Sequence, residues 1–76
     1  MLRRHELAGP SLARALREAR AHADLSREQV AARVGCSPSA VGTWEHGRDL
    51  RADRLPRLAE ALGVSVETLI AWATED

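Results

Sequence analysis

The sequence predicts an all-α protein, a compact five-helix bundle with a central helix-turn-helix. The apolar residues are dominated by Ala, Leu and Val, with two Trp and neither Phe nor Tyr. Ala and Arg favour helices, while the β-branched and aromatic residues that favour a sheet are sparse. Residues 25–47 also contain two helix-capping serines and a glycine stop between them.

The 76 residues are enough for one domain, and the breaker pair Gly9-Pro10 divides them. We expect residues 1–10 to form a flexible basic N-terminal arm and residues 11–76 to form the helical domain. A first helix is predicted from a cap at Ser11 to about His22. Its apolar residues repeat at i, i+4, i+7 and i+11, as expected of one helical face; they are Leu12, Leu16, Ala19 and Ala23.

A second helix is predicted over about 27–34. Ser26 can cap it, and Gln29 three residues later completes a capping box. Gly35 follows where a helix ends in the left-handed conformation, which glycine adopts at low cost. The apolar stripe of this helix is Val30, Ala31 and Val34.

A third helix is predicted over about 38–46. Ser37 can cap it, Pro38 falls at its first position, where a missing N–H costs nothing, and Gly47 ends it. Two capped helices with about three residues between them form a helix-turn-helix. The second helix of such a unit commonly enters the major groove of DNA.

The remaining chain predicts two more helices after a polar loop at 48–52. Asp53 is the candidate cap of a fourth helix that Gly63 stops, with Pro56 in its first turn. Ser65 and Thr68 are the candidate cap of a fifth helix. The apolar residues of these helices are Leu55, Leu58, Ala59 and Leu62 in the fourth, and Leu69, Ile70 and Trp72 in the fifth.

Composition excludes several classes of function. A single cysteine, Cys36, excludes a disulfide framework and is expected to be a core thiol. No segment approaches the ~18 apolar residues of a membrane span, and no signal peptide is visible, which favours a cytoplasmic protein. The histidines lack metal-site spacing, and no catalytic pair is evident, so we expect no enzyme, metal, cofactor or small-molecule ligand.

Three segments resemble the lambda-repressor-like, XRE/Cro-type family of DNA-binding domains. They are LSREQVAARVG at 25–35, SPSAVGTWEHG at 37–47 and LAEALGVSVETLI at 58–70. The resemblance implies a sequence-specific transcriptional regulator, most simply a repressor, that binds double-stranded DNA. In such domains the helix corresponding to 38–46 enters the major groove of a pseudo-palindromic operator.

The resemblance implies two sets of DNA contacts. Val41 and Trp44 should face the core, which leaves the opposite face of the third helix for DNA. Pro38 stands where many relatives carry a glutamine that reads adenine, so Arg27 is expected to contact a guanine or a phosphate instead. The expected base contacts are Pro38, Ser39, Gly42, Thr43 and Arg27, and the expected phosphate contacts are Ser26, His46, Arg48 and Arg51.

For each of these residues the alternative is an ordinary solvated surface. Gly42 is unusual inside a helix, which suggests close approach of its backbone to DNA. The alternative is neutral drift at a site where a glycine is tolerated. The N-terminal arm, with Arg3, Arg4 and His5, either reaches DNA or is plainly disordered. Asp53 occupies the position from which some relatives insert an arginine into the minor groove, so that contact should be missing.

Two structural roles are also implied. Arg20 and Glu45 match a pair that forms a buried salt bridge in similar domains, the alternative being two separate surface charges. A homodimer is expected, with Leu50, Leu69, Ile70 and Trp72 as its interface. The alternative is that Leu69 and Ile70 close the core and Trp72 lies across it.

The charge balance keeps a second function open. The chain has 11 basic and 11 acidic residues, and this zero net charge is not the basic balance of a typical nucleic-acid binder. Together with Pro38, it favours a protein-interaction module on the same fold, an antitoxin-like or regulatory partner with weak or no DNA binding.

Overall fold

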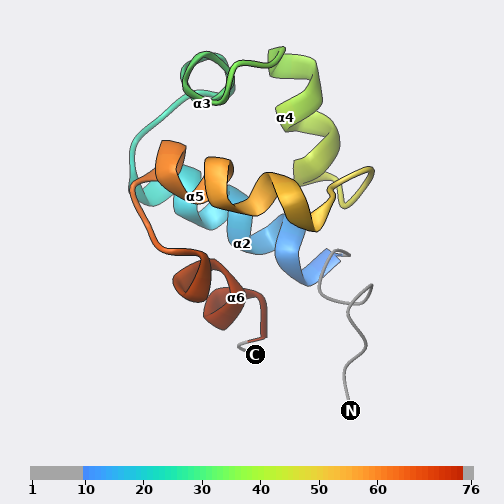
Figure 1. The fold of residues 1–76 in the computed structure, drawn as a ribbon, viewed down its shortest axis with the longest axis vertical. Helices are drawn as coiled ribbons and strands as arrows, with labels where there is room; N and C mark the ends of the chain where they lie inside the picture. The colour runs from blue at the N-terminus through green and yellow to red at the C-terminus, as the bar shows by residue number, and fades with distance from the viewer. Residues whose placement is uncertain (1–9, 75–76) are drawn as a thin grey trace.

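The computed structural model describes residues 10–74, which form five α-helices and a short 3-10 helix and, within that range, no strand (Figure 1). The all-α prediction is confirmed. The elements are α2 (Pro10–His22), α3 (Arg27–Val34), α4 (Pro38–Glu45), η1 (Ala52–Arg54), α5 (Leu55–Leu62) and α6 (Val66–Thr74).

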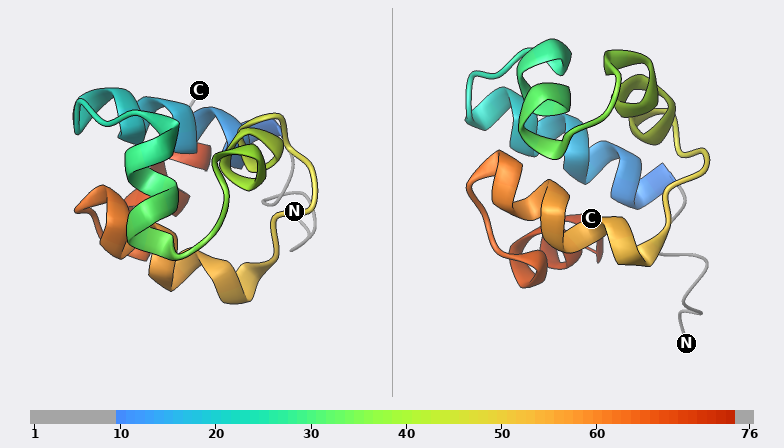
Figure 2. Two further views of the ribbon diagram at one scale, coloured as in Figure 1. Left: turned by 90° about the horizontal axis from the view of Figure 1, so that it is seen from above. Right: turned by 45° about the horizontal axis from the view of Figure 1, so that its top comes forward.

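The helices pack around α2. It contacts α6 on one side and α4 on the other, while α3 bridges α4 and α5. The pair α3 and α4 therefore lies at one end of the molecule and α6 at the opposite end, as Figures 1 and 2 show. The core between them is formed largely by fully buried aliphatic side chains, among them Ala15, Val30, Leu58 and Leu69.

Local capping chemistry sets most helix boundaries as predicted. Ser26 Oγ accepts from the Gln29 N–H at 3.1 Å, and the Gln29 side chain accepts from the Ser26 N–H at 2.8 Å. Gly35 ends α3 with a φ of +89°, in the left-handed region. Ser65 Oγ accepts from the Thr68 N–H at 3.0 Å at the start of α6.

Three local predictions were wrong. The first helix begins at Pro10 instead of after a cap at Ser11, since proline fits the first turn of a helix. Ala23 is exposed because α2 ends before it. Asp53 does not cap the fourth helix, because it lies inside η1, which runs directly into α5 with Arg54 as the N-cap.

Three further expectations concern the cysteine, membrane-spanning helices and the N-terminal arm. Cys36, expected to be a core thiol, is only half-buried and packs against the edge of the core. No helix in residues 10–74 is long and apolar enough to cross a membrane. Of the arm predicted over residues 1–10, residues 1–9, with Arg3, Arg4 and His5, lie outside the described residues, whereas Pro10 belongs to α2.

Candidate nucleic-acid interface

The turn between α3 and α4 presents the start of α4 at the surface. Ser37 Oγ accepts from the Ala40 N–H at 3.2 Å, and Pro38 occupies the first turn of the helix. The apolar side of α4 is buried, with Val41 2% and Trp44 7% exposed, as predicted. The opposite side of the helix is therefore left for the surface.

An open depression of about 690 Å³ runs along this outward side. It is lined by Arg27, Pro38, Ser39, Gly42, Thr43, His46, Arg48 and Asp49. It brings together seven of the nine residues predicted to contact DNA; Ser26 and Arg51 are not among its lining residues. The sequence did not single out Asp49, which has a φ of +57° and adds a carboxylate to the lining.

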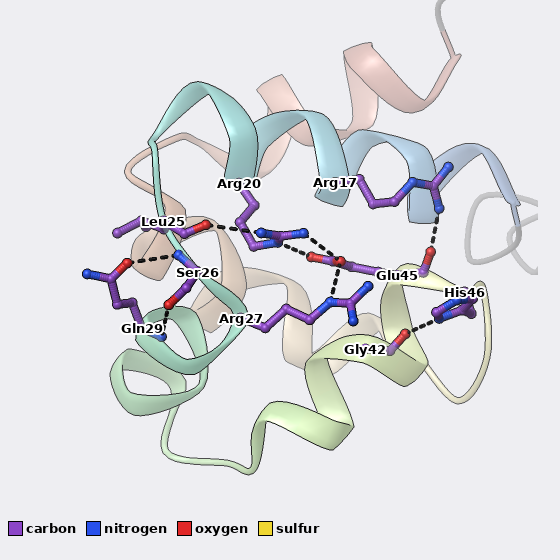
Figure 3. Close-up of polar contacts among 9 residues, drawn as sticks. All are labelled: Arg17, Arg20, Leu25, Ser26, Arg27, Gln29, Gly42, Glu45 and His46. Carbon is purple, nitrogen blue, oxygen red and sulfur yellow. Dashed lines mark hydrogen bonds and ion pairs between the residues drawn. The ribbon is translucent and has the colours of Figure 1, made fainter.

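Two polar side chains of the depression are oriented by the backbone of α4. The Thr43 hydroxyl donates to the Ser39 carbonyl at 3.0 Å, so its oxygen is left to accept. His46 Nδ1 lies 2.6 Å from the Gly42 carbonyl oxygen (Figure 3). Because a carbonyl only accepts, Nδ1 carries the proton, and Nε2 remains for an outside partner.

The expected phosphate-contacting residues differ in their surroundings. Arg48 and Arg51 are exposed. Arg51 Nε lies 3.8 Å from Asp53 Oδ1, but the two side chains are 80% and 70% exposed, so this pair contributes little. The Ser26 hydroxyl already caps α3.

The Glu45 carboxylate lies beneath the depression and holds α2, α3 and α4 together. Its side chain is 2% exposed. Arg20 Nε donates to Oε2 at 2.6 Å and Arg20 Nη2 to Oε1 at 3.2 Å, so the pair expected from the sequence is present. Arg27 Nε also donates to Oε1, at 3.1 Å, and Arg17 Nη1 donates to the Glu45 backbone carbonyl (Figure 3).

This bonding stabilises the charged form of Arg20 further. The hydrogen bond to Glu45 raises the pKa of the Arg20 guanidinium above its ordinary value, and the opposing effect of burial is smaller. A raised pKa means that the stabilisation is fully present below the arginine's unfolded pKa and is lost only above it. Arg20 therefore supports α4 throughout the physiological pH range.

Several arginines that the sequence reading missed cap helices from a neighbouring helix. Arg14 donates to the Trp72 carbonyl at 3.0 Å, Arg33 to the Ala61 carbonyl at 3.0 Å, and Arg57 to the Val34 carbonyl at 3.4 Å. Each carbonyl lies in the last turn of its helix, where acceptors lack intrahelical partners. One feature of the sequence could have indicated these contacts: every basic residue other than histidine is an arginine, whose guanidinium carries five N–H donors.

A family model described as a helix-turn-helix domain matches residues 11–72. The chain belongs to this family. Among solved structures, this helix-turn-helix domain is similar to the clp gene regulator ClgR from C. glutamicum, with 29% identity and a TM-score of 0.82. That match covers 88% of this chain and 87% of the ClgR chain.

The fold also occurs within a larger enzyme. Hydroxypropylphosphonic acid epoxidase from S. wedmorenis matches with 28% identity and a TM-score of 0.73, over 80% of this chain. The helix-turn-helix domain spans only 33% of the epoxidase chain, so the likeness concerns one part of that enzyme. No curated protein matches the chain.

The four residues expected at a dimer interface of this helix-turn-helix domain fall into two groups. Leu50 and Leu69 are 7% and 0% exposed within one chain, so they are core residues and offer no surface to a partner. Ile70 and Trp72 are half-buried. The Trp72 ring lies 5.4 Å from the His22 ring, centroid to centroid.

Within residues 10–74, no group of three or more His, Cys, Asp or Glu side chains could hold a metal ion. The polar groups that line the candidate site are hydroxyls, one imidazole, guanidinium groups and the Asp49 carboxylate, all around one helix face.

Proposed function

We propose that the chain is a DNA-binding transcriptional regulator that inserts α4 into the major groove of duplex DNA. One observation carries the proposal: the outward side of α4 and the residues around it line a single open depression, with hydroxyl and guanidinium groups among them. Side chains of these types bond base edges and phosphates. The likeness to a gene regulator over nearly the whole chain supports the same function.

In this proposal the two kinds of contact are divided between α4 and its flanks. Ser39 and Thr43 approach the base edges, where a threonine methyl can also touch a thymine methyl. Arg48 and Arg51 approach phosphates, and His46 can donate to a phosphate through Nε2 when its ring is protonated at both nitrogens. Pro38 has no N–H to donate, so it adds only apolar contact at the start of the helix.

The finer proposal is a cytoplasmic repressor that binds a pseudo-palindromic operator as a homodimer. Ile70 and Trp72 are the largest of the apolar residues of α6 that keep part of their surface exposed, Val66 and Ala71 being the others, so they are the candidates for a small dimer contact. Two-fold symmetry would place the half-sites about one helical turn apart.

A second candidate is a protein-interaction module on the same fold. The arginine bonding within the chain favours it: Arg17, Arg20 and Arg27 all bond to Glu45, and the net charge is zero. Such a module would bind DNA weakly or not at all.

Replacing Arg48 and Arg51 together by Ala separates the two candidates. We expect lower affinity for every duplex. We also expect the slope of log K against log salt concentration to become shallower by about two, one for each phosphate contact. Fluorescence anisotropy at several salt concentrations measures both quantities. Arg33→Ala is the matched control, because Arg33 bonds to the end of α5 instead. Weak binding that the double substitution leaves unchanged would favour the protein-interaction module.

A further inference from the structure

We infer that Arg27, which Glu45 holds at Nε, reads a guanine base. The inference rests on the proposed function and names one base class in the operator. Arg27 begins α3 and so lies outside α4, yet it lines the same depression as Ser39 and Thr43. Guanine offers two acceptors in the major groove, O6 and N7, at a spacing that the arginine fork matches.

The guanidinium is fixed at one end only. Arg27 Nε donates to Glu45 Oε1 at 3.1 Å, and Glu45 is itself 2% exposed and held by Arg20. An arginine has five N–H groups, so this bond leaves the four on Nη1 and Nη2. Among the described residues these four have no hydrogen bond to a protein acceptor. The Arg27 side chain remains 42% exposed, so the two terminal nitrogens can be reached from outside.

Gly42 lies next to the guanidinium. A Cβ added at Gly42 would lie 3.7 Å from Arg27 Nη1 and 3.9 Å from Cζ, at ordinary van der Waals distance. The guanidinium therefore lies beside the middle of α4. Base edges meet a recognition helix along such a face, whereas phosphates meet the rim around it. Figure 3 shows Arg27 between α3 and α4, with Gly42 and Glu45 nearby.

The local charge favours a base over a phosphate. The Glu45 carboxylate offsets part of the positive charge of Arg27, which weakens the attraction for a phosphate. Bidentate bonding to a base depends instead on the fixed plane of the fork, which the bond at Nε provides. Exposed arginines for phosphates are already available at Arg48 and Arg51.

The test compares the wild-type chain and Arg27→Lys in a selection from random duplex DNA at near-physiological salt. Lysine keeps the positive charge beside Glu45 but lacks the planar fork. We expect the wild type to enrich a guanine in each half-site and the variant to enrich it less strongly while keeping the other preferences, because a lysine can bond guanine acceptors but cannot hold both in a fixed plane. The discrimination at that base pair should fall by about 5- to 140-fold, the range for one bidentate contact.

A modified duplex tests the same contact without altering the protein. Replacing the selected guanine by 7-deazaguanine removes the N7 acceptor, which should weaken wild-type binding more than binding by Arg27→Lys. If Arg27→Lys enriches the same guanine as strongly as the wild type, or if 7-deazaguanine has no effect on the wild type, the inference is wrong while the proposed function stands. If the wild type enriches no sequence at all, both fail.

Discussion

Replacing Glu45 by Gln should lower the free energy of unfolding by about 3 kcal/mol, near the lower end of the range for breaking a buried ion pair. The substitution keeps the shape of the side chain but removes the charge that Arg20 and Arg27 share. The loss falls at the lower end because the two arginine side chains are 24% and 42% exposed and keep some hydration. Urea unfolding followed by circular dichroism measures it, and with a slope of about 1 kcal/mol per molar urea the midpoint should fall by about 3 M.

Glu18→Gln is the matched control for this charge change. Glu18 pairs with Arg14 at 3.6 Å along the surface of α2, where the two side chains are 49% and 41% exposed. An exposed i,i+4 pair contributes no more than about 0.5 kcal/mol. Equal losses for the two variants would contradict a special role of Glu45 in holding α2, α3 and α4 together.

Replacing Leu69 by Ala should cost about 2–5 kcal/mol, because the side chain is 0% exposed and its removal leaves a cavity. Since Leu69 is buried within one chain, the loss should not depend on protein concentration. Thermal unfolding over a hundredfold range of concentration measures this.

Ile70→Ala is the control for Leu69, because it lies one residue along α6 and is only half-buried. We expect it to cost less than about 2 kcal/mol and to weaken any self-association. If only Leu69→Ala showed a loss of stability that depends on protein concentration, Leu69 would belong to an interface between chains and not to the core.

What the sequence predicted well depends on chemistry within a few residues. The bounds of α3 follow from the Ser26–Gln29 capping box and the stop at Gly35, all within ten residues. The outward face of α4 follows in the same way from helical periodicity, because Val41 and Trp44 face the core together.

What the sequence could not predict depends on how distant helices meet. Arg17 and Arg27 reach Glu45 across 28 and 18 residues, and no local pattern encodes either contact. Leu50 and Leu69 looked like surplus apolar surface, but the fold buries both. The cap predicted at Asp53 fails for a different reason, since η1 joins α5 without a break.

Selection from random duplexes by three proteins tests most directly whether the outward face of α4 reads DNA. These are the wild type, Thr43→Ala and Thr74→Ala. Thr74 is the matched control because its hydroxyl makes the same bond to the carbonyl four residues earlier, at 3.1 Å, on α6. The wild type and Thr74→Ala should enrich one inverted repeat with half-sites about 10–11 base pairs apart, and Thr43→Ala should change the bases enriched within it. Absence of enrichment by the wild type, or one unchanged site for all three proteins, would contradict DNA recognition by this face.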